Sequence, residues 1–373
     1  MNPVMSKEAL PAVRESLRVA AVPWVAARVL VAAGWVIAAN LVGSRFVEGR
    51  PEQLRQGLFM WDGSWYRDLA IYGYHSAPRE AFRFFPLLPW LGRVIGALPL
   101  VPTSWVVVAI ANAGALVAGV LIHRLTWLET GDARTAQRAV WMLALFPGAF
   151  AMAFAYAEGL FVALALGVFL ALRRGRFGLA AVLGLLAALC RPTGVLLVFP
   201  AAVEVARSWK QARPRVAGVA AVLAPLLGGA LVLLHSSIVG QAWDDPVQAQ
   251  RELRHATVFP LVRMARAVGD LFGPERFGDG LHAFAAVGLV VALVLCARWL
   301  PASSSAYVGA AALLFLSADN LNSLERYTLN AVPVVIVAAL LGRRRWVEWS
   351  IFAVMGGAFI GLTTASLLGA YVP

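Results

Sequence analysis

The sequence has 373 residues, of which 60% are hydrophobic and only 14% charged, and its mean hydropathy is +0.74. Soluble domains carry about 25% charged residues, so this chain lacks the polar surface that water requires. Because backbone groups in hydrocarbon must bond internally, such a chain forms helices or a closed barrel. The apolar runs are long and do not alternate with polar residues, which excludes barrel strands and predicts an all-α polytopic integral membrane protein with a helical bundle.

The net charge is +12 and the pI about 10.7, and nearly all of the positive charge is arginine. In an apolar chain, arginines in short cytoplasmic loops set the topology and contact anionic headgroups, so we expect a membrane and no nucleic acid as partner. Cys190 and Cys296 lie in apolar runs, and no Cys/His cluster has metal-ligand spacing. No cofactor is therefore expected, and a bound divalent cation stays an open alternative.

Apolar runs long enough to cross a membrane recur along the chain, because a spanning helix needs roughly 20 apolar residues. Residues 1–20 are polar and amphipathic, which predicts a cytoplasmic interfacial segment. We predict about 11 spans, with roughly 10 to 12 as the range. The candidate spans are residues 21–42, 103–123, 139–155, 157–172, 177–190, 193–207, 216–239, 282–300, 305–319, 328–342 and 346–369.

Basic clusters at 124–138, 173–176, 207–215 and 343–345 determine the predicted orientation. If all of them face the cytoplasm, residues 43–102 and 240–281 are two extracytoplasmic loops of a single transmembrane domain, residues 1–373. The apolar stretch 84–101 must then be re-entrant or interfacial, which its three prolines favour. If that stretch spans the membrane instead, the count rises by one and a basic cluster moves outside.

The first predicted outer loop contains the string WDGSWYRD, residues 61–68. Trp61, Trp65 and Tyr66 supply aromatic faces that can stack on a sugar. Asp62 lies among them and could act as a general base. An interfacial aromatic belt with a helix-capping aspartate is the alternative interpretation of the same residues, and the spacing alone does not decide between them.

Five segments along the chain resemble one family in the same order. They are WDGSWYRDLAIYGY followed by FRFFPLLP, LFPGAFAMAFAYAEGLF (145–161), ALCRPTGVLL (188–197), WDDPVQAQ (243–250) and ERYTLNAVPVVIVAALL (325–341). Together they resemble the signature of the PIG-V mannosyltransferase family and its bacterial relatives, which belong to the GT-C class of membrane glycosyltransferases. The resemblance covers most of the chain between residues 57 and 341.

The resemblance implies an enzyme of the cell membrane. GT-C enzymes take a sugar from a polyprenyl phosphate and transfer it to an acceptor on the extracytoplasmic face, with an acidic residue of the first outer loop as catalytic base. The matching position is Asp62. The chain departs from the family pattern in three places: the next acid is Asp68 instead of a DxD or ExD pair, Leu88 stands in a tyrosine place, and the second segment has YAEG instead of YSES. These departures leave the substrates open.

We therefore expect a polyprenyl-phosphate-linked hexose, first of all mannose, as donor and a lipid or glycan of the cell envelope as acceptor. Asp62 would take the acceptor's proton in a single inverting displacement, and Arg191 or Arg326 would hold the departing phosphate. Glu158 could orient the acceptor or pair with Arg191. The expected substrate-binding residues are Trp61, Trp65, Tyr66, Asp68, Tyr74, Glu158, Arg191, Asp245, Gln250, Arg326 and Tyr327.

Three other functions remain alternatives on the sequence alone. A secondary transporter also places rare charges in membrane helices, often beside breaks in those helices. A lipid-linked glycan ligase or a flippase-like protein would handle the same lipid donors. A third alternative, a non-enzymatic scaffold, would not need Asp62 at all. Substrate movement across the membrane without any dependence on a lipid phosphate would favour the transporter.

Overall fold

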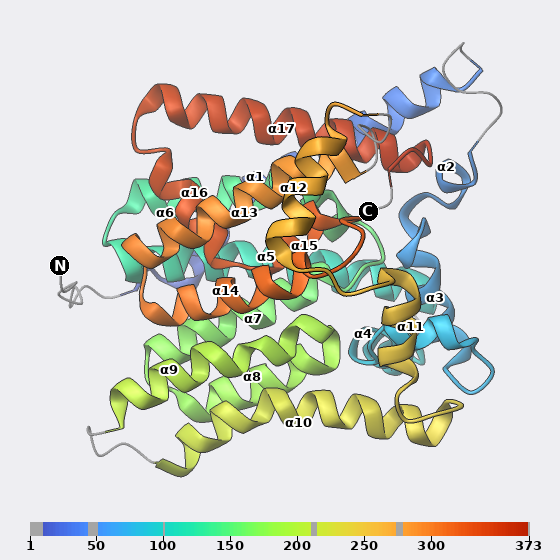
Figure 1. Ribbon diagram of the computed structural model, residues 1–373, viewed down its shortest axis with the longest axis horizontal. Coiled ribbons are helices and arrows are strands. Elements are labelled where there is room, and N and C mark those ends of the chain that lie inside the picture. The colour runs from blue at the N-terminus through green and yellow to red at the C-terminus, as the bar shows by residue number, and fades with distance from the viewer. Residues whose placement is uncertain (1–9, 44–50, 100, 210–214, 274–278, 372–373) are drawn as a thin grey trace.

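The computed structural model describes residues 10–43, 51–99, 101–209, 215–273 and 279–371. These residues form a bundle of α-helices and short 3-10 helices (η), with an isolated antiparallel bridge between Thr257 and Ala318 (Figure 1). In chain order the elements are α1 (Val13–Leu41), α2 (Glu52–Gln56), η1 (Gly57–Phe59), α3 (Asp62–Tyr72), η2 (Arg79–Arg83), α4 (Leu87–Gly96), α5 (Thr103–Thr130), α6 (Ala133–Ala144), η3 (Pro147–Ala153), α7 (Glu158–Arg173), α8 (Phe177–Cys190), η4 (Pro192–Leu197), α9 (Val198–Ser208), α10 (Arg215–Val239), α11 (Asp245–Arg254), α12 (Pro260–Asp270), α13 (Asp279–Trp299), α14 (Ala302–Leu316), α15 (Leu324–Asn330), α16 (Pro333–Leu341) and α17 (Arg345–Leu367).

The predicted helical bundle is confirmed. Among the described residues, five helices are long and apolar enough to cross a membrane: α1, α5, α10, α13 and α17. Two bent pairs, η3 with α7 and α15 with α16, raise the number to seven if each pair is one span, while α4, α8 and α14 are shorter apolar helices. Each predicted span falls on one of these helices or on a neighbouring pair, and the total of about 11 stays a prediction.

Three predicted spans are not continuous helices. In residues 139–155, α6 ends at Ala144 and η3 begins at Pro147, whose ring cannot continue the preceding helix. Residues 193–207 divide between η4 and α9, and residues 328–342 divide where Pro333 begins α16. The chain bends by 109° between η3 and α7 and by 95° between α15 and α16. These bends turn helix ends, with their polar side chains, toward the interior.

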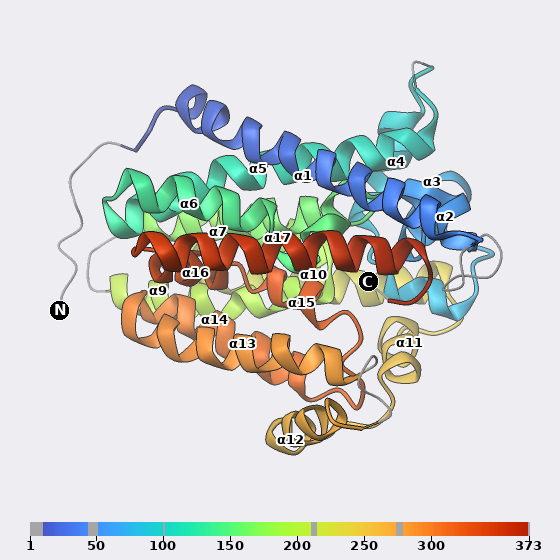
Figure 2. The same cartoon turned by 90° about the horizontal axis from the view of Figure 1, so that it is seen from above.

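Of the elements in the two predicted outer loops, α2, α3, α4 and α11 lie at the same end of the bundle in both views, whereas α12 packs along α13 (Figures 1 and 2). Within the stretch 84–101, α4 has ten residues. A helix of that length extends about 15 Å, roughly half of the hydrocarbon core. This length fits the predicted re-entrant or interfacial segment, although which side of the membrane this end faces stays a prediction.

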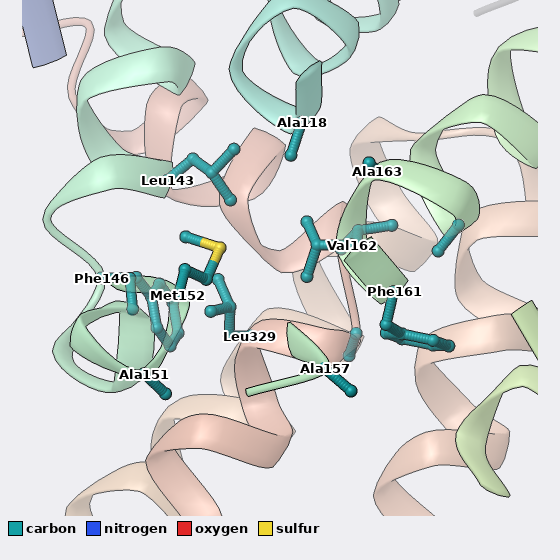
Figure 3. Close-up of a cluster of buried hydrophobic side chains, with 14 of the residues drawn as sticks. Ala118, Leu143, Phe146, Ala151, Met152, Ala157, Phe161, Val162, Ala163 and Leu329 are labelled. Atoms are coloured by element: carbon teal, nitrogen blue, oxygen red, sulfur yellow. The ribbon is translucent and has the colours of Figure 1, made fainter. Parts of the chain in front are cut away.

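The core lies where η3, α6, α7 and α15 meet. Leu143, Met152 and Leu329 come together there from three of these elements, beside Val162 of α7 (Figure 3), and all four side chains are buried. In a membrane the apolar lipid offers little hydrophobic gain for such contacts, so close packing through small residues must hold the helices together.

Gly148 shows how close this packing is. A Cβ atom on Gly148 would lie 2.5 Å from the Cα atom of Arg326, so the absence of a side chain lets η3 rest directly on α15. Gly159 has the same role between α7 and α5, since its Cβ would lie 2.1 Å from the carbonyl oxygen of Ala111. Both contacts position helices that carry charged residues of the site.

Candidate functional site

Four helix ends meet near the loop end of the bundle and place charged side chains together. Asp62 is the first residue of α3 and Glu158 the first residue of α7. Arg191 follows the last residue of α8, and Arg326 lies in the short helix α15. Because the bent pairs turn α7 and α15 inward, residues that are far apart in the sequence become neighbours.

These four residues form a continuous chain of ion pairs. Nη1 of Arg326 lies 2.6 Å from Oδ2 of Asp62 and 3.3 Å from Oε1 of Glu158. Arg191 donates to the same oxygen of Glu158. The side chain of Glu158 is 0% exposed and that of Arg326 4% exposed, whereas that of Asp62 is 23% exposed. Asp62 is therefore the most exposed member of the network.

The pairing explains how the charges are tolerated away from water. A buried charge without a partner is strongly destabilising, and Glu158 compensates two arginines at once. The compensation leaves spare groups, because Nε of Arg191, Nε of Arg326 and Oε2 of Glu158 are buried and have no hydrogen-bond partner among the described residues. Unpaired buried donors on arginines are groups that an incoming anion could satisfy.

Three arginine side chains lie around the ring of Tyr327. The guanidinium carbons of Arg191, Arg254 and Arg326 lie 5.7, 4.6 and 5.3 Å from its centroid. Cation–π attraction of this kind holds guanidinium groups over a ring face without neutralising them. Tyr327 thus gathers three cations around one aromatic side chain, and only two of the three belong to the ion-pair chain with carboxylates.

A cavity of about 720 Å³ adjoins these residues, within the range of small-molecule sites. One part of its wall is apolar, with Leu233, Val247 and Leu313 among its residues. The charged side chains that line it are Asp62, Arg83, Arg191, Arg251, Arg254 and Arg326. Among the described residues, Asp62 is therefore the single carboxylate that lines the cavity, together with several arginines and beside a surface suited to hydrocarbon.

The backbone at Trp61 sets the position of Asp62. Trp61 has φ of +52°, a left-handed conformation that costs an ordinary residue roughly 1–3 kcal/mol. Its indole Nε1 donates to the carbonyl oxygen of Ser366 at 3.1 Å, and Ser64 Oγ donates to the carbonyl oxygen of Trp61 at 2.8 Å. These bonds, one of them to the end of α17, hold the turn from which α3 begins.

Several of the predicted substrate-binding residues lie together at the cavity. Tyr66, Arg191, Gln250, Arg326 and Tyr327 line it with Asp62, and Glu158 lies behind the two arginines. Burial raises the pKa of Tyr66 well above its ordinary value. Its hydroxyl is therefore neutral at physiological pH and can act as a hydrogen-bonding group.

The structure places the other predicted binding residues outside the cavity lining. Trp65 stacks on Phe84 with ring centroids 5.7 Å apart, and the hydroxyl of Tyr74 donates to the Phe84 carbonyl at 2.6 Å. Asp68 pairs with its neighbour Arg67 at 2.7 Å. These three residues, like Trp61, build the wall around α3 and are not among the residues that face the cavity.

Asp245 is buried and supports the second loop. Its Oδ2 accepts hydrogen bonds from the backbone of Gln241 and Ala242, both at 2.8 Å, and its Oδ1 lies 3.3 Å from Nε of Arg79. It thereby ties the start of α11 to η2 of the first loop. Asp245 is also outside the cavity lining.

Arg254 and Arg83 line the cavity but are not among the substrate-binding residues expected from the sequence. Arg254 donates to the carbonyl oxygen of Asn322 at 3.2 Å and so joins the second loop to the segment before α15. Its spacing from Gln250 was a usable signal, since residues four apart on a helix share a face. Among the described residues, no group of three or more His, Cys, Asp or Glu side chains could hold a metal ion.

Comparison with known proteins finds similarity among solved structures. No family model matches the chain, and no curated protein matches it. The crystal structure of ArnT from Cupriavidus metallidurans bound to undecaprenyl phosphate is similar, with a TM-score of 0.52 and 15% sequence identity. The match covers 88% of this chain and 62% of that chain, less than two thirds of its length.

At this identity the likeness shows the fold alone. The predicted GT-C-type helical-bundle fold is supported by this likeness, whereas glycosyltransferase activity and the narrower resemblance to the PIG-V family stay proposals. This chain is a multi-pass membrane protein similar in fold to ArnT.

Proposed function

We propose that the protein is a membrane glycosyltransferase that moves a hexose, first of all mannose, from a polyprenyl phosphate to a lipid or glycan acceptor. The observation that carries the proposal is Asp62, a partly exposed carboxylate that lines the cavity together with five arginines. The undecaprenyl phosphate bound by ArnT, whose fold is similar, supports a polyprenyl carrier. The sequence segments that resemble the PIG-V family support mannose.

Asp62 is proposed as the base. Arg326 holds Oδ2, and Oδ1 makes no hydrogen bond or ion pair with the described residues, so one oxygen is oriented while the other is available. The acceptor hydroxyl attacks C1 of the sugar and gives its proton to Asp62. The bond between C1 and the phosphate oxygen breaks, and its electron pair leaves with the polyprenyl phosphate. A single displacement of this kind inverts the anomeric centre.

The arginines around Tyr327 are proposed to stabilise the departing phosphate. Negative charge grows on the phosphate as the bond breaks, and fixed guanidinium groups in a site of low dielectric stabilise such charge effectively. Arg191 and Arg326 keep buried Nε donors for this purpose, and Arg254 adds a cation without a carboxylate partner in the described residues. Glu158 would hold the first two arginines in place and would not contact the sugar.

The apolar wall of the cavity is proposed to accommodate the first units of the polyprenyl chain. The predicted extracytoplasmic location of this end of the bundle follows from the basic clusters, which the topology argument places on the opposite side. The polyprenyl assignment rests on the apolar residues of the cavity wall, and the extracytoplasmic assignment rests on the distribution of arginines along the chain.

The proposal is tested with purified protein, radiolabelled sugar donors and a total membrane-lipid extract as acceptor. Polyprenyl-phosphate-mannose is compared with polyprenyl-phosphate-glucose and with GDP-mannose. The expected result is a labelled lipid product from a polyprenyl-linked donor and none from the nucleotide sugar. Product from the nucleotide sugar alone would contradict the proposal. So would failure of every polyprenyl-linked donor together with uptake of free solute by proteoliposomes, which would favour a transporter.

A further inference from the structure

A second cavity lies on a different part of the bundle, along helices α4, α5, α7 and α8. It measures about 530 Å³ and has mainly leucine, isoleucine, valine and alanine side chains on its wall. Val117 and Leu179 at this cavity are 48% and 47% exposed, so it is open on the outer surface of the bundle. In the described chain it shares no lining residue with the cavity at Asp62.

Three arginines lie at one end of this second cavity. Arg124 is near the end of α5, Arg174 follows α7, and Arg176 precedes α8. Within the described residues none of the three forms an ion pair with a carboxylate, and Nε of Arg124 is buried without a hydrogen-bond partner. We name Arg124, Arg174 and Arg176 the arginine trio.

The neighbouring Arg173 shows that the lack of partners is specific to the trio. It belongs to the same turn, yet it pairs with Glu129 at 2.6 Å and with Glu204 at 3.4 Å. The turn between α7 and α8 thus places Arg173 beside acidic partners and places Arg174 and Arg176 at the apolar cavity. An anion bound among three like charges relieves their mutual repulsion.

The dimensions of the cavity match a lipid. Its wall follows α5 from Ile110 to Arg124, a rise of about 21 Å at 1.5 Å per residue. One leaflet contributes about 15 Å to the hydrocarbon core, so an acyl chain in this groove would reach across its leaflet. Basic pockets between membrane helices are known to bind anionic lipid headgroups on the cytoplasmic side, where the topology prediction places this turn.

We propose that this second cavity is a binding site for an anionic phospholipid of the cytoplasmic leaflet, with its phosphate at the arginine trio and an acyl chain along α5, α7 and α8. The site is distinct from donor binding. Glu158 and Arg173 are the first and last residues of α7, which puts roughly 22 Å between the catalytic end and the trio. A lipid held at the trio is too far from Asp62 to deliver a sugar, and the inference does not rest on the proposed function.

The test is native mass spectrometry of the delipidated full-length protein, titrated with phosphatidylglycerol or phosphatidylcholine. The wild type is expected to bind one phosphatidylglycerol in strong preference to phosphatidylcholine. The variant R124Q/R174Q/R176Q is expected to bind phosphatidylglycerol roughly ten- to a hundredfold more weakly, because each basic residue near an anionic headgroup contributes measurably. The matched control R343Q/R344Q/R345Q removes three exposed arginines of another predicted cytoplasmic turn and is expected to bind like the wild type.

A second variant tests the apolar part of the groove. Ala113 lines the cavity and is exposed at its surface, so Ala113→Trp should fill the groove and weaken binding while the trio stays intact. Equal affinity of the wild type for the two lipids would overturn the proposal, as would equal losses in the trio variant and its control. Displacement of phosphatidylglycerol by a lower concentration of polyprenyl phosphate would also overturn it, because the site would then belong to the carrier lipid.

Discussion

The two cavities are both lined by arginine, but they differ in how that charge is compensated. At the loop end, Arg191 and Arg326 share the buried carboxylate of Glu158, and Arg326 also holds Asp62. At the other end, the arginine trio has no carboxylate partner among the described residues. A cation deep in the protein must carry its own counter-ion, whereas a cation at an open groove can take one from the membrane. The comparison implies a rigid site at one end and an exchangeable lipid at the other.

The largest effect is expected when the shared counter-ion is removed. Glu158→Ala would leave Arg191 and Arg326 as adjacent buried cations, and removal of one partner from a buried pair typically costs about 3–5 kcal/mol. We expect the thermal unfolding temperature in detergent to fall by several degrees or more, together with loss of transfer activity. The control is Glu252→Ala, because Glu252 pairs with Arg79 at 3.3 Å in an exposed position and such pairs contribute little. Equal stability of the two variants would contradict a buried network that depends on Glu158.

A smaller and more selective effect is expected at Arg254, which lies over Tyr327 at the cavity. Arg254→Gln should raise the KM for the lipid donor about tenfold, because a phosphate ligand is lost while the buried network stays intact. The unfolding temperature should change little. The control Arg266→Gln removes an arginine that pairs with Asp319 at 3.6 Å and is 58% exposed. If both variants raise KM by the same factor, Arg254 acts only through the overall positive charge and is not a specific phosphate ligand.

The turn before α3 gives a weaker test of rigidity. Trp61→Phe keeps an aromatic ring but removes the hydrogen bond to Ser366, which is worth about 1 kcal/mol. We expect a several-fold loss of kcat with little change in KM, since Asp62 would be held less firmly. The measurement is steady-state transfer at saturating donor. An unchanged kcat would show that the anchor to α17 does not position Asp62.

The smallest effect is expected at Tyr66. Because burial raises its pKa, the hydroxyl keeps its proton between about pH 6 and pH 9 and cannot contribute a titration there. Tyr66→Phe should therefore leave the shape of the pH profile of kcat/KM unchanged, with a loss of about threefold or less from the missing hydrogen bond. A shift of the alkaline limb in this variant would instead identify Tyr66 as a titrating group of the reaction.

The helical class could be predicted from composition, because a chain with so little charge must satisfy its backbone inside helices. From the sequence, the arginine clusters predict that Asp62 and Arg326 lie on the same outer face of the membrane. They do not predict that the two side chains are in contact. Their separation of 2.6 Å depends on the bends before α7 and α16. A hydropathy window does not reveal such bends, because it averages over both sides of a break and does not distinguish a straight helix from a broken one.

The local directions of side chains were harder to predict than their location. Asp62 and Tyr66 are four residues apart on α3 and share the face that lines the cavity, whereas Asp68 lies on another face and pairs with Arg67. Before the helix is known to begin at Asp62, the string WDGSWYRD does not distinguish these faces. Asp245 was chosen from its sequence context, but whether an aspartate faces a ligand or caps its own loop depends on tertiary contacts.

The central claim, that Asp62 accepts a proton during sugar transfer, is tested most directly by comparing Asp62→Asn with Asp68→Asn in the purified enzyme. Both changes remove one carboxylate from the same helix, but only Asp62 lines the cavity. With a polyprenyl-phosphate sugar as donor, Asp62→Asn should lower kcat by about 10²- to 10⁴-fold, as expected for loss of a general base, while Asp68→Asn should stay close to wild type. A folded Asp62→Asn enzyme that keeps full transfer activity would contradict the account.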